Sequence, residues 1–430
     1  MNDFTQELRD RFARSEGAPL RLLREASFAR FAKLGLPTTQ DEEWKYTSLA
    51  PLAQLRFERA AETTVRDVDR WTIADVAARL VFVNGRYRPE LSSRAPGGAF
   101  AGSLAVALAE HPELVESELG RHADGQRDAL TALNTAFIED GAFVHLPAGA
   151  VLHAPIHLLY LSTAPGKPTL SQPRNLIVAG ANSQAAVVET YAGPGDEVYF
   201  TNAVTEVVLG ENAGLDHYKL QEESARAFHV AATQVRCGRG SRFTSHSLAL
   251  GAALARNEMR ALFASEGGEC TLNGLYMATG KQHLDNRTVI DHKSPRCTSR
   301  ELYKGVLDGQ SRGVFSGRVL VRQDAQKTDA RQTNKNLLLS DDAVVDTKPQ
   351  LEIFANDVKC AHGAAVGQLD ETALFYLRTR GIGEEAARSL LTYAFASEMV
   401  NLVPLGPLRA RVRDLVTSKL PAFERLKEAA

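Results

Sequence analysis

Cysteine and tryptophan are scarce in this sequence of 430 residues, which contains four cysteines and two tryptophans. Cys237, Cys270, Cys297 and Cys360 are irregularly spaced and form no CxxC pair, so the sequence shows no disulfide framework. It also lacks an apolar run long enough to cross a bilayer, and its first residues lack the apolar core of a secretion signal. We therefore expect a cytoplasmic protein with reduced thiols and no membrane partner.

An excess of charge of either sign is also missing. The formal net charge is −2 and the isoelectric point is near 6.6. This balance gives no electrostatic reason to expect a nucleic acid partner. Hydrophobic residues make up 44% of the sequence and charged residues 24%, which is typical of a globular protein with a large buried core.

Three familiar motifs of catalysis and nucleotide binding are absent as well. The sequence contains no GxxxxGK followed by Ser or Thr, no GxGxxG and no HExxH. These absences argue against a P-loop, a dinucleotide site and a zinc protease.

Eleven histidines are scattered along the chain, and three of them form a loose group at His145, His153 and His157. Three imidazoles could hold a metal ion, but Pro147 and Pro155 interrupt the strand pairing that would bring them together. We therefore favour ordinary polar roles for this group. Structural roles are also expected for His217, His229, His246, His283 and His292, and buried, inert thiols for Cys237, Cys270 and Cys297.

The sequence divides into three regions, of which the first, residues 1–140, is rich in predicted helix. Leu8 and Phe12 are four residues apart, as on one face of a helix, and Pro37 ends a second helical segment. The segment LVFVNGRYRPEL, residues 80–91, instead predicts a hairpin of two strands joined by an Asn-Gly turn.

Residues 141–375 predict a mainly β structure. Short segments rich in Val, Leu, Thr and Phe alternate with Gly, Asn and Asp, a pattern that fits a sandwich, a propeller or a solenoid. Turn-then-strand units such as GENAGLD and GRGSRF recur without a long crossover, which favours a solenoid of stacked parallel strands. No strict sequence period is visible.

Residues 376–430 return to predicted helix. GIGEEAARSLLTYAFASEMVNLV and LRARVRDLVTSKL read as two helices with Pro404 and Pro407 between them. Phe395, Met399 and Val400 lie on the first of these helices. They could contact a partner protein, or they could pack on the end of the solenoid and cap its hydrophobic column, and the sequence leaves both alternatives open.

The segment DVKCAHGAAVG places two metal-ligating residue types, Cys360 and His362, two positions apart, with no other Cys or His within twelve residues. On a strand they would share one face, about 6.6 Å apart along the backbone. Ligands of one tetrahedral ion lie roughly 3.5–4 Å apart. The pair is therefore at most half of a metal site, or else a packed thiol beside a satisfied imidazole.

Two longer segments resemble one protein family. Residues 327–382 closely resemble the C-terminal part of the SufB/SufD family of iron–sulfur cluster assembly proteins, and DEEWKYTSLAPL, residues 41–52, resembles its N-terminal signature. The KCAHG segment is of the SufD type. Leu377 stands where SufB proteins usually carry a cysteine that is used in cluster assembly.

This resemblance implies a right-handed parallel β-helix flanked by helical regions and a non-catalytic scaffold role in the SUF system. In the family, SufD pairs with SufB through the β-helices, and each binds one copy of the ATPase SufC through its C-terminal helical region. A nascent cluster forms at the SufB–SufD junction. The proposed SufD ligand corresponds to His362, and Cys360 corresponds to a cysteine near the same junction.

The resemblance further implies that iron or a transient Fe–S cluster is shared with SufB, so the isolated chain is expected to hold no cofactor. A homodimer through the same β-helix surface is plausible for the isolated chain, because strand edges would otherwise be exposed. Two alternatives come from other classes of protein. A β-helix enzyme acting on polysaccharide is disfavoured by an aromatic content of 7%, and an autonomous metalloprotein would carry stoichiometric metal.

Overall fold

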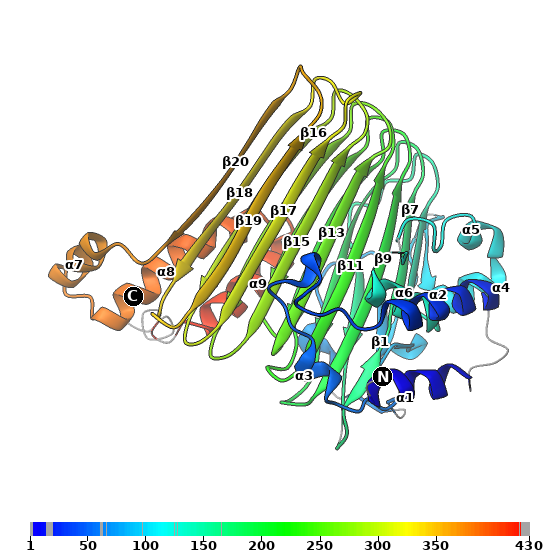
Figure 1. Cartoon of the computed structure of the whole chain (residues 1–430), viewed down its shortest axis with the longest axis horizontal. Coiled ribbons are helices and arrows are strands. Elements are labelled where there is room, and N and C mark those ends of the chain that lie inside the picture. Colours follow the sequence, from blue (N-terminus) through cyan, green and yellow to red (C-terminus); the bar gives the residue numbers. More distant parts are fainter. Residues whose placement is uncertain are drawn as a thin grey trace.

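The computed structural model describes residues 3–13, 20–60, 63–65, 67–96, 98–123, 125–126, 128–164, 166–420 and 422. Strands dominate its central part, and helices lie at both ends of the chain (Figure 1). Among the described residues, no helix is both long and apolar enough to cross a membrane.

The first helices gather beside one end of the strands. Phe12 of α1 (Asp3–Ala13) stacks on Phe28 of α2 (Arg21–Leu34) with ring centroids 4.2 Å apart. Together with α6 (Ala129–Ala136) they cover the apolar outer side of β9 and β11. The remaining helices of this region are short: η1 (Glu42–Trp44), α3 (Ala50–Ala53), η2 (Val68–Trp71), η3 (Pro89–Leu91), α4 (Leu104–Glu110) and α5 (Pro112–Glu116).

The predicted hairpin forms between β1 (Ala78–Val83) and β2 (Arg86–Tyr87). Its turn residues Asn84 and Gly85 have φ values of 52° and 77°, as a tight turn between twisted strands requires. β1 also pairs in parallel with β5 (Ile156–Leu161), and β3 (Phe100–Ser103) pairs with β4 (Ala142–Leu146). The sheets of the central region therefore begin within the first 140 residues.

Two parallel sheets form the body of the molecule, and the chain alternates between them. The first sheet has the order β2-β1-β5-β8-β10-β12-β14-β16-β18-β20, and the second runs β3-β4-β7-β9-β11-β13-β15-β17-β19, with β6 paired to β9. This is a β-solenoid, which confirms the prediction. The strands are β6 (Thr169–Ser171), β7 (Arg174–Ala179), β8 (Gln184–Ala192), β9 (Tyr199–Leu209), β10 (Gly214–Glu222), β11 (Phe228–Cys237), β12 (Arg242–Ala249), β13 (Leu254–Phe263), β14 (Glu269–Ala278), β15 (His283–His292), β16 (Thr298–Leu307), β17 (Arg312–Val321), β18 (Asp329–Leu338), β19 (Val344–Ile353) and β20 (Lys359–Gly367).

The corners of the solenoid explain both its regularity and the missing sequence period. From β8 onward, successive strands of the first sheet begin 27 to 31 residues apart, so the coils differ in length. One corner position nevertheless recurs, and its φ is positive in six successive coils: Asn182, Asn212, Gly240, Gly267, Arg296 and Lys327. Asn and Gly tolerate this left-handed conformation, which accounts for the Gly- and Asn-rich spacers in the sequence.

The interior of the solenoid is apolar in most coils but contains a buried ionic network. The His217 Nε2 atom lies 3.2 Å from Glu189 Oε1, and Lys219 Nζ donates to His229 Nε2 at 2.9 Å. Burial lowers the pKa of Lys219 to about 8. His217 and His229 are thus structural, as predicted, and Cys237, Cys270 and Cys297 are buried free thiols, also as predicted.

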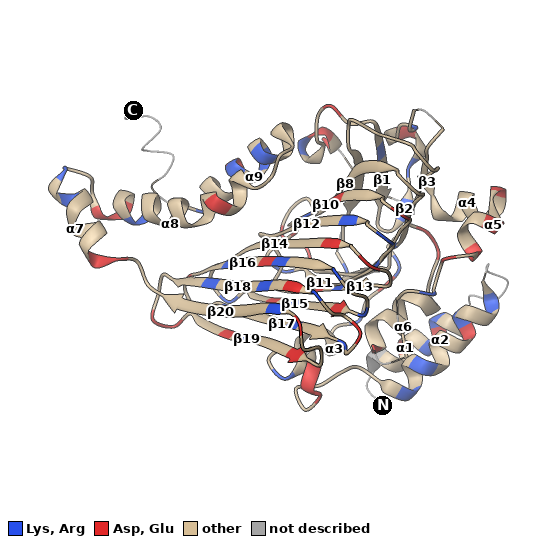
Figure 2. Ribbon diagram, turned by 90° about the horizontal axis from the view of Figure 1, so that it is seen from above, with Lys and Arg blue, Asp and Glu red and all other residues tan. Residues whose placement is uncertain are grey.

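The C-terminal helices are α7 (Glu371–Thr379), α8 (Glu384–Asn401) and α9 (Gly406–Ser418). α8 and α9 lie along the outside of the first sheet, whereas α7 extends away from it (Figure 2). Met399 and Val400 are buried against the outward-facing side chains of β12, β14 and β16, among them Leu248, Leu275 and Val306. Met399 and Val400 therefore pack on the solenoid, as the second alternative expected, but on the outer face of a sheet rather than on the end of the solenoid. The outer face of the sheet is itself apolar, and it requires the cover that α8 and α9 provide.

Candidate functional site

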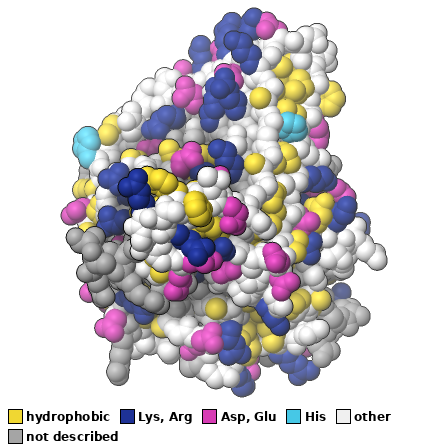
Figure 3. Space-filling model, turned by 90° about the vertical axis from the view of Figure 1, so that its left-hand side faces the viewer, with side chains coloured by type: hydrophobic (Ala, Val, Ile, Leu, Met, Phe, Trp, Pro, Cys, Tyr) yellow, Lys and Arg dark blue, Asp and Glu magenta, His cyan; other side chains and the backbone are white. Residues whose placement is uncertain are grey.

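The end of the solenoid formed by β19 and β20 is not covered by any part of the chain that the structure describes. Each strand is the last of its sheet, so each presents one free edge of backbone N–H and C=O groups. Ile353 and Val366 continue the inward-facing columns of the core, yet they are 41% and 48% exposed. Hydrophobic side chains gather in a line on this side of the molecule (Figure 3). This open end has the character of an interface rather than of a finished surface.

Cys360 and His362 lie together at this end. In the register of β20 with β18, Cys360 is opposite Ala330 and His362 is opposite Gln332, and both of these partners are buried. The two candidate ligands therefore share the inward face of the strand, as the spacing predicted. His362 is exposed, whereas Cys360 is partly buried beside Val319 and Val321.

The two side chains differ in how readily they would bind iron. Burial raises the pKa of the Cys360 thiol, so it stays protonated until a metal ion or a cationic group draws near. A neutral, exposed imidazole has a free lone pair, so it can bind a metal ion without first losing a proton. Among the described residues, no group of three or more Cys, His, Asp or Glu is arranged to hold a metal ion. The donor set fits iron only if further ligands come from another molecule.

A row of buried amides lies directly beneath β20, on the inward face of β18. Gln332 Nε2 donates to Glu301 Oε2 at 2.7 Å, and Asn334 Nδ2 donates to the Tyr303 carbonyl at 3.1 Å. Asn336 Nδ2 then donates to Asn334 Oδ1 at 2.6 Å. The sequence reasoning missed this row, although the alternation of amides in QTNKN was a signal for it.

Glu301 is the acidic member of this region. Its side chain is on the inward face of β16, only 4% of the residue is exposed, and burial raises its pKa to about 7. A carboxyl group with such a pKa is protonated in part of the molecules at neutral pH.

The group of three histidines near residue 150 does not assemble. His157 is fully buried on β5, where its Nε2 atom lies 2.9 Å from Thr190 Oγ1. His145 is on β4, which belongs to the other sheet, and His153 is exposed in the connection between them. These residues therefore have the ordinary polar roles that we favoured.

The residues proposed for partner contact on α8 all pack against the first sheet, but they differ in burial. Met399 and Val400 are 1% and 2% exposed and face the sheet. Phe395 is partly exposed, and Lys304 Nζ lies 4.3 Å from its ring centroid and donates to its carbonyl oxygen. The open hydrophobic surface of this region is on α7, where Phe375 and Tyr376 are 68% and 55% exposed.

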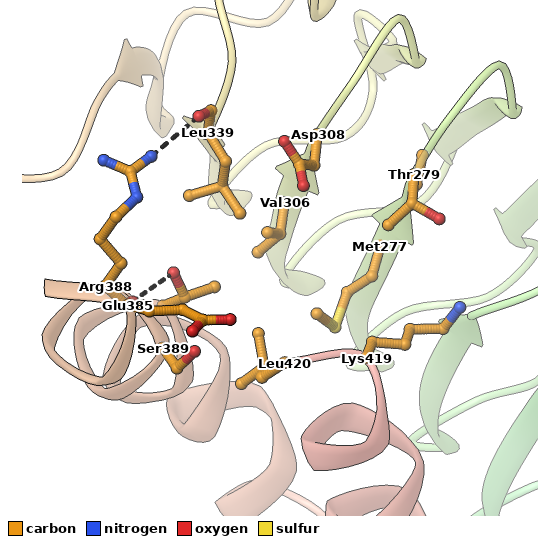
Figure 4. Close-up of a pocket in the computed structure, with 12 residues that line it drawn as sticks. Met277, Thr279, Val306, Asp308, Leu339, Glu385, Arg388, Ser389, Lys419 and Leu420 are labelled. Carbon is orange, nitrogen blue, oxygen red and sulfur yellow. Dashed lines mark hydrogen bonds between the residues drawn. The ribbon is translucent and has the colours of Figure 1, made fainter. Parts of the chain in front are cut away.

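A small pocket of about 190 Å³ lies between α8, the end of α9 and the first sheet (Figure 4). Met277, Val306 and Leu420 contribute apolar wall, and Arg388 Nη2 donates to the Leu339 carbonyl at 2.9 Å. Its volume is below the ~300–1,000 Å³ of most ligand sites. We therefore regard it as a packing gap where the helices meet the sheet.

A larger groove of about 490 Å³ on the outer face of the second sheet is lined by several arginines. Three of its five arginines, Arg260, Arg318 and Arg322, have ion-pair partners. Arg322 makes two bonds to Asp291, at 2.8 and 2.7 Å, and Arg260 is paired with Glu258. Ion pairs thus account for part of the charge of this groove.

One stretch, GQSRG at residues 309–313, matches the GxSxG pattern of serine hydrolases. It forms the corner between β16 and β17 rather than a strand-to-helix turn. Ser311 is fully buried, and its Oγ donates to the Ala278 carbonyl at 3.2 Å. The hydroxyl cannot act as a nucleophile in this position.

Comparison with known proteins gives consistent matches over most of the chain. Residues 160–395 match the SUF system FeS cluster assembly SufBD core domain, and residues 2–158 match the SufBD protein N-terminal region. The chain is 36% identical over 409 residues to an iron–sulfur cluster assembly SufBD family protein of Synechocystis, which covers 92% of this chain and 90% of that protein. It is 32% identical over 396 residues to the iron–sulfur cluster assembly protein SufD of Escherichia coli, with 91% of each chain covered. With SufD of Bacillus subtilis it shares 28% identity over 333 residues, 75% of this chain and 74% of that protein.

Proposed function

This chain belongs to the SufBD family of iron–sulfur cluster assembly proteins, as a SufD-type member, and we propose that it acts as a non-catalytic scaffold subunit. In this proposal, the open end of its solenoid docks on SufB, and His362 becomes a ligand of the cluster that forms between the two subunits. One observation carries the proposal. Cys360 and His362 continue the inner columns of the solenoid in its last coil, which no described residue covers.

The chemistry of the open end supports a solenoid as the partner. Two free strand edges and an exposed hydrophobic column are covered best by a second molecule with matching edges. SufB is a β-helix of the same family by the resemblance described above, so its strands can meet β19 and β20. The same surface would support a homodimer when SufB is missing.

Iron or a nascent cluster is the cargo of this site. His362 offers a nitrogen and Cys360 a sulfur, which is too few donors for a tetrahedral iron. The remaining ligands would be supplied by SufB, so the site exists only while the subunits are docked. Such a shared site releases its cargo when the interface opens, and metal binding is coupled to assembly. All four cysteines are free thiols, which is consistent with the cytoplasm as the proposed compartment.

The C-terminal helices are the proposed binding region for SufC. Phe395, Met399 and Val400 remain the candidate residues of α8, and Phe375 and Tyr376 of α7 add an exposed hydrophobic patch. Because Met399 and Val400 hold α8 on the sheet, we propose that they transmit movement of SufC to the solenoid. Phe395 and the α7 residues would make the direct contact.

The proposal is tested by replacing His362 in a complex co-expressed with SufB and SufC. We expect His362→Ala to leave assembly of the complex intact and to lower the yield of cluster at least tenfold, as loss of a metal ligand does. His153→Ala is the matched control, since His153 is also exposed but far from the open end along the chain. An unchanged cluster yield in an intact His362→Ala complex would refute the ligand role. Failure of the chain to co-elute with SufB and SufC would refute the subunit role.

A further inference from the structure

Three side chains on adjacent strands form one column that ends at His362. Glu301 of β16 pairs in register with Gln332 of β18, and Gln332 pairs in register with His362 of β20. Neighbouring strands are about 4.8 Å apart, so each side chain of such a column is within reach of the next. Glu301 and Gln332 are buried, and His362 is exposed. The column therefore leads from the closed interior to the open end.

The amide of Gln332 has a fixed orientation. Its Nε2 atom donates to Glu301 Oε2 at 2.7 Å, so its NH₂ group faces the carboxyl group. The amide oxygen, Oε1, has no hydrogen-bond partner among the residues that the structure describes, although Gln332 is only 1% exposed. A buried acceptor without a donor is destabilising, so each one in a native core calls for an explanation.

The opposite sheet leaves room for this amide. Gly317 of β17 faces Gln332 across the interior, and a Cβ atom at residue 317 would lie 2.3 Å from Gln332 Nε2. An alanine at this position would push the amide out of its place. The glycine therefore allows a polar side chain to occupy the core directly behind His362.

We infer that Gln332, oriented by Glu301, is a positioning residue for His362. In this inference, the exposed ring of His362 turns toward Gln332, and the free Oε1 atom, which has no partner in the structure as described, accepts a hydrogen bond from one ring N–H. This bond selects one tautomer and leaves the other ring nitrogen unprotonated and directed out of the open end, ready to bind iron. Hydrogen bonds from a ligating histidine to a second residue fix its ring in this way in metal sites. The functional meaning of this inference rests on the proposed function, but the contact between Gln332 and His362 is tested separately.

The chain contains a matched control pair. Gln221 is also 1% exposed, its Nε2 atom donates to Glu223 Oε2 at 3.0 Å, and its Oε1 atom also has no partner among the described residues. This pair is in the coil of β10, several coils from the open end, so the amide oxygen of Gln221 cannot contact His362. A substitution at Gln221 therefore reproduces the loss of a buried amide without the loss of the proposed contact.

The experiment measures the tautomers of His362 by ¹⁵N NMR of the full chain labelled in histidine, with His362→Ala used to identify the signal. We expect the wild-type ring to be biased to one tautomer by about fivefold relative to exposed His153, as one net hydrogen bond would produce. Gln332→Met should remove this bias, Gln332→Glu should retain it because an acceptor oxygen remains, and Gln221→Met should leave it unchanged.

The outcomes separate this inference from the function on which it rests. A His362 tautomer ratio equal to that of His153 in the wild-type chain overturns the inference even if Gln332→Met fails to fold. A bias that persists in folded Gln332→Met overturns it as well. If the bias follows Gln332 while His362→Ala complexes still build clusters normally, the positioning role stands and the proposed ligand role fails.

Discussion

Replacing the buried carboxyl group of Glu301 by an amide should stabilise the protein above neutral pH. Burial raises the pKa of Glu301 from 4.5 to about 7. Between these values the folded chain holds a proton that the unfolded chain has released, so stability falls as the pH rises from about 4.5 to about 7. The penalty reaches about 3 kcal/mol at pH 8, because each pKa unit corresponds to about 1.4 kcal/mol. Glu301→Gln removes this penalty and still offers Gln332 an acceptor oxygen.

The assay is urea unfolding of wild-type and Glu301→Gln chains at pH 5 and pH 8. The two chains should unfold at similar urea concentrations at pH 5. At pH 8 the variant should be the more stable, by about 3 kcal/mol. Glu211→Gln, at an exposed corner, controls for removal of a charge and should change stability by less than about 0.5 kcal/mol at either pH. A Glu301→Gln chain that is less stable than the wild type at pH 8 would show that the ionised carboxylate is favoured in the core, and would refute the reasoning.

Three further experiments test the packing of the chain and the proposed contact with SufC. Met399→Ala opens a cavity between α8 and the sheet and should cost about 2–5 kcal/mol in urea unfolding, and no loss would mean that α8 is not fixed there. Arg174→Met leaves the fully buried Glu206 without its ion-pair partner at 2.6 Å and should cost about 3–5 kcal/mol, part of which Glu206→Gln should restore in the double variant. Phe375→Ala with Tyr376→Ala on exposed α7 should change stability by less than about 0.5 kcal/mol while weakening co-elution with SufC, and unchanged co-elution would remove α7 from that interface.

The general fold was accessible from the sequence because its signals are local. Alternating side chains identify strands, Asn84-Gly85 identifies a hairpin, and Asn or Gly at the corners permits a positive φ. The sequence could not show that α8 covers the outer face of a sheet. That arrangement depends on outward-facing residues such as Leu275 and Val306, whose burial by α8 is a long-range contact.

The candidate site was accessible only in part. The spacing of Cys360 and His362 was sufficient to place both on one face of a strand, as the register confirms. The column behind them was not predictable. Gln332 and Glu301 are 31 residues apart in the sequence, and they become neighbours only because one coil of the solenoid has that length. The sequence also does not mark which coil is the last, and that position is what exposes His362.

The most direct test of the central idea is pulsed EPR on a reduced, cluster-loaded complex with SufB and SufC in which only this chain carries ¹⁵N-histidine. A ¹⁵N nucleus bound to the cluster gives a strong hyperfine coupling. We expect that coupling in the wild-type complex and its loss in His362→Ala. Its absence from the wild-type complex, or its persistence in His362→Ala, would contradict the role of His362 as a ligand completed by a partner.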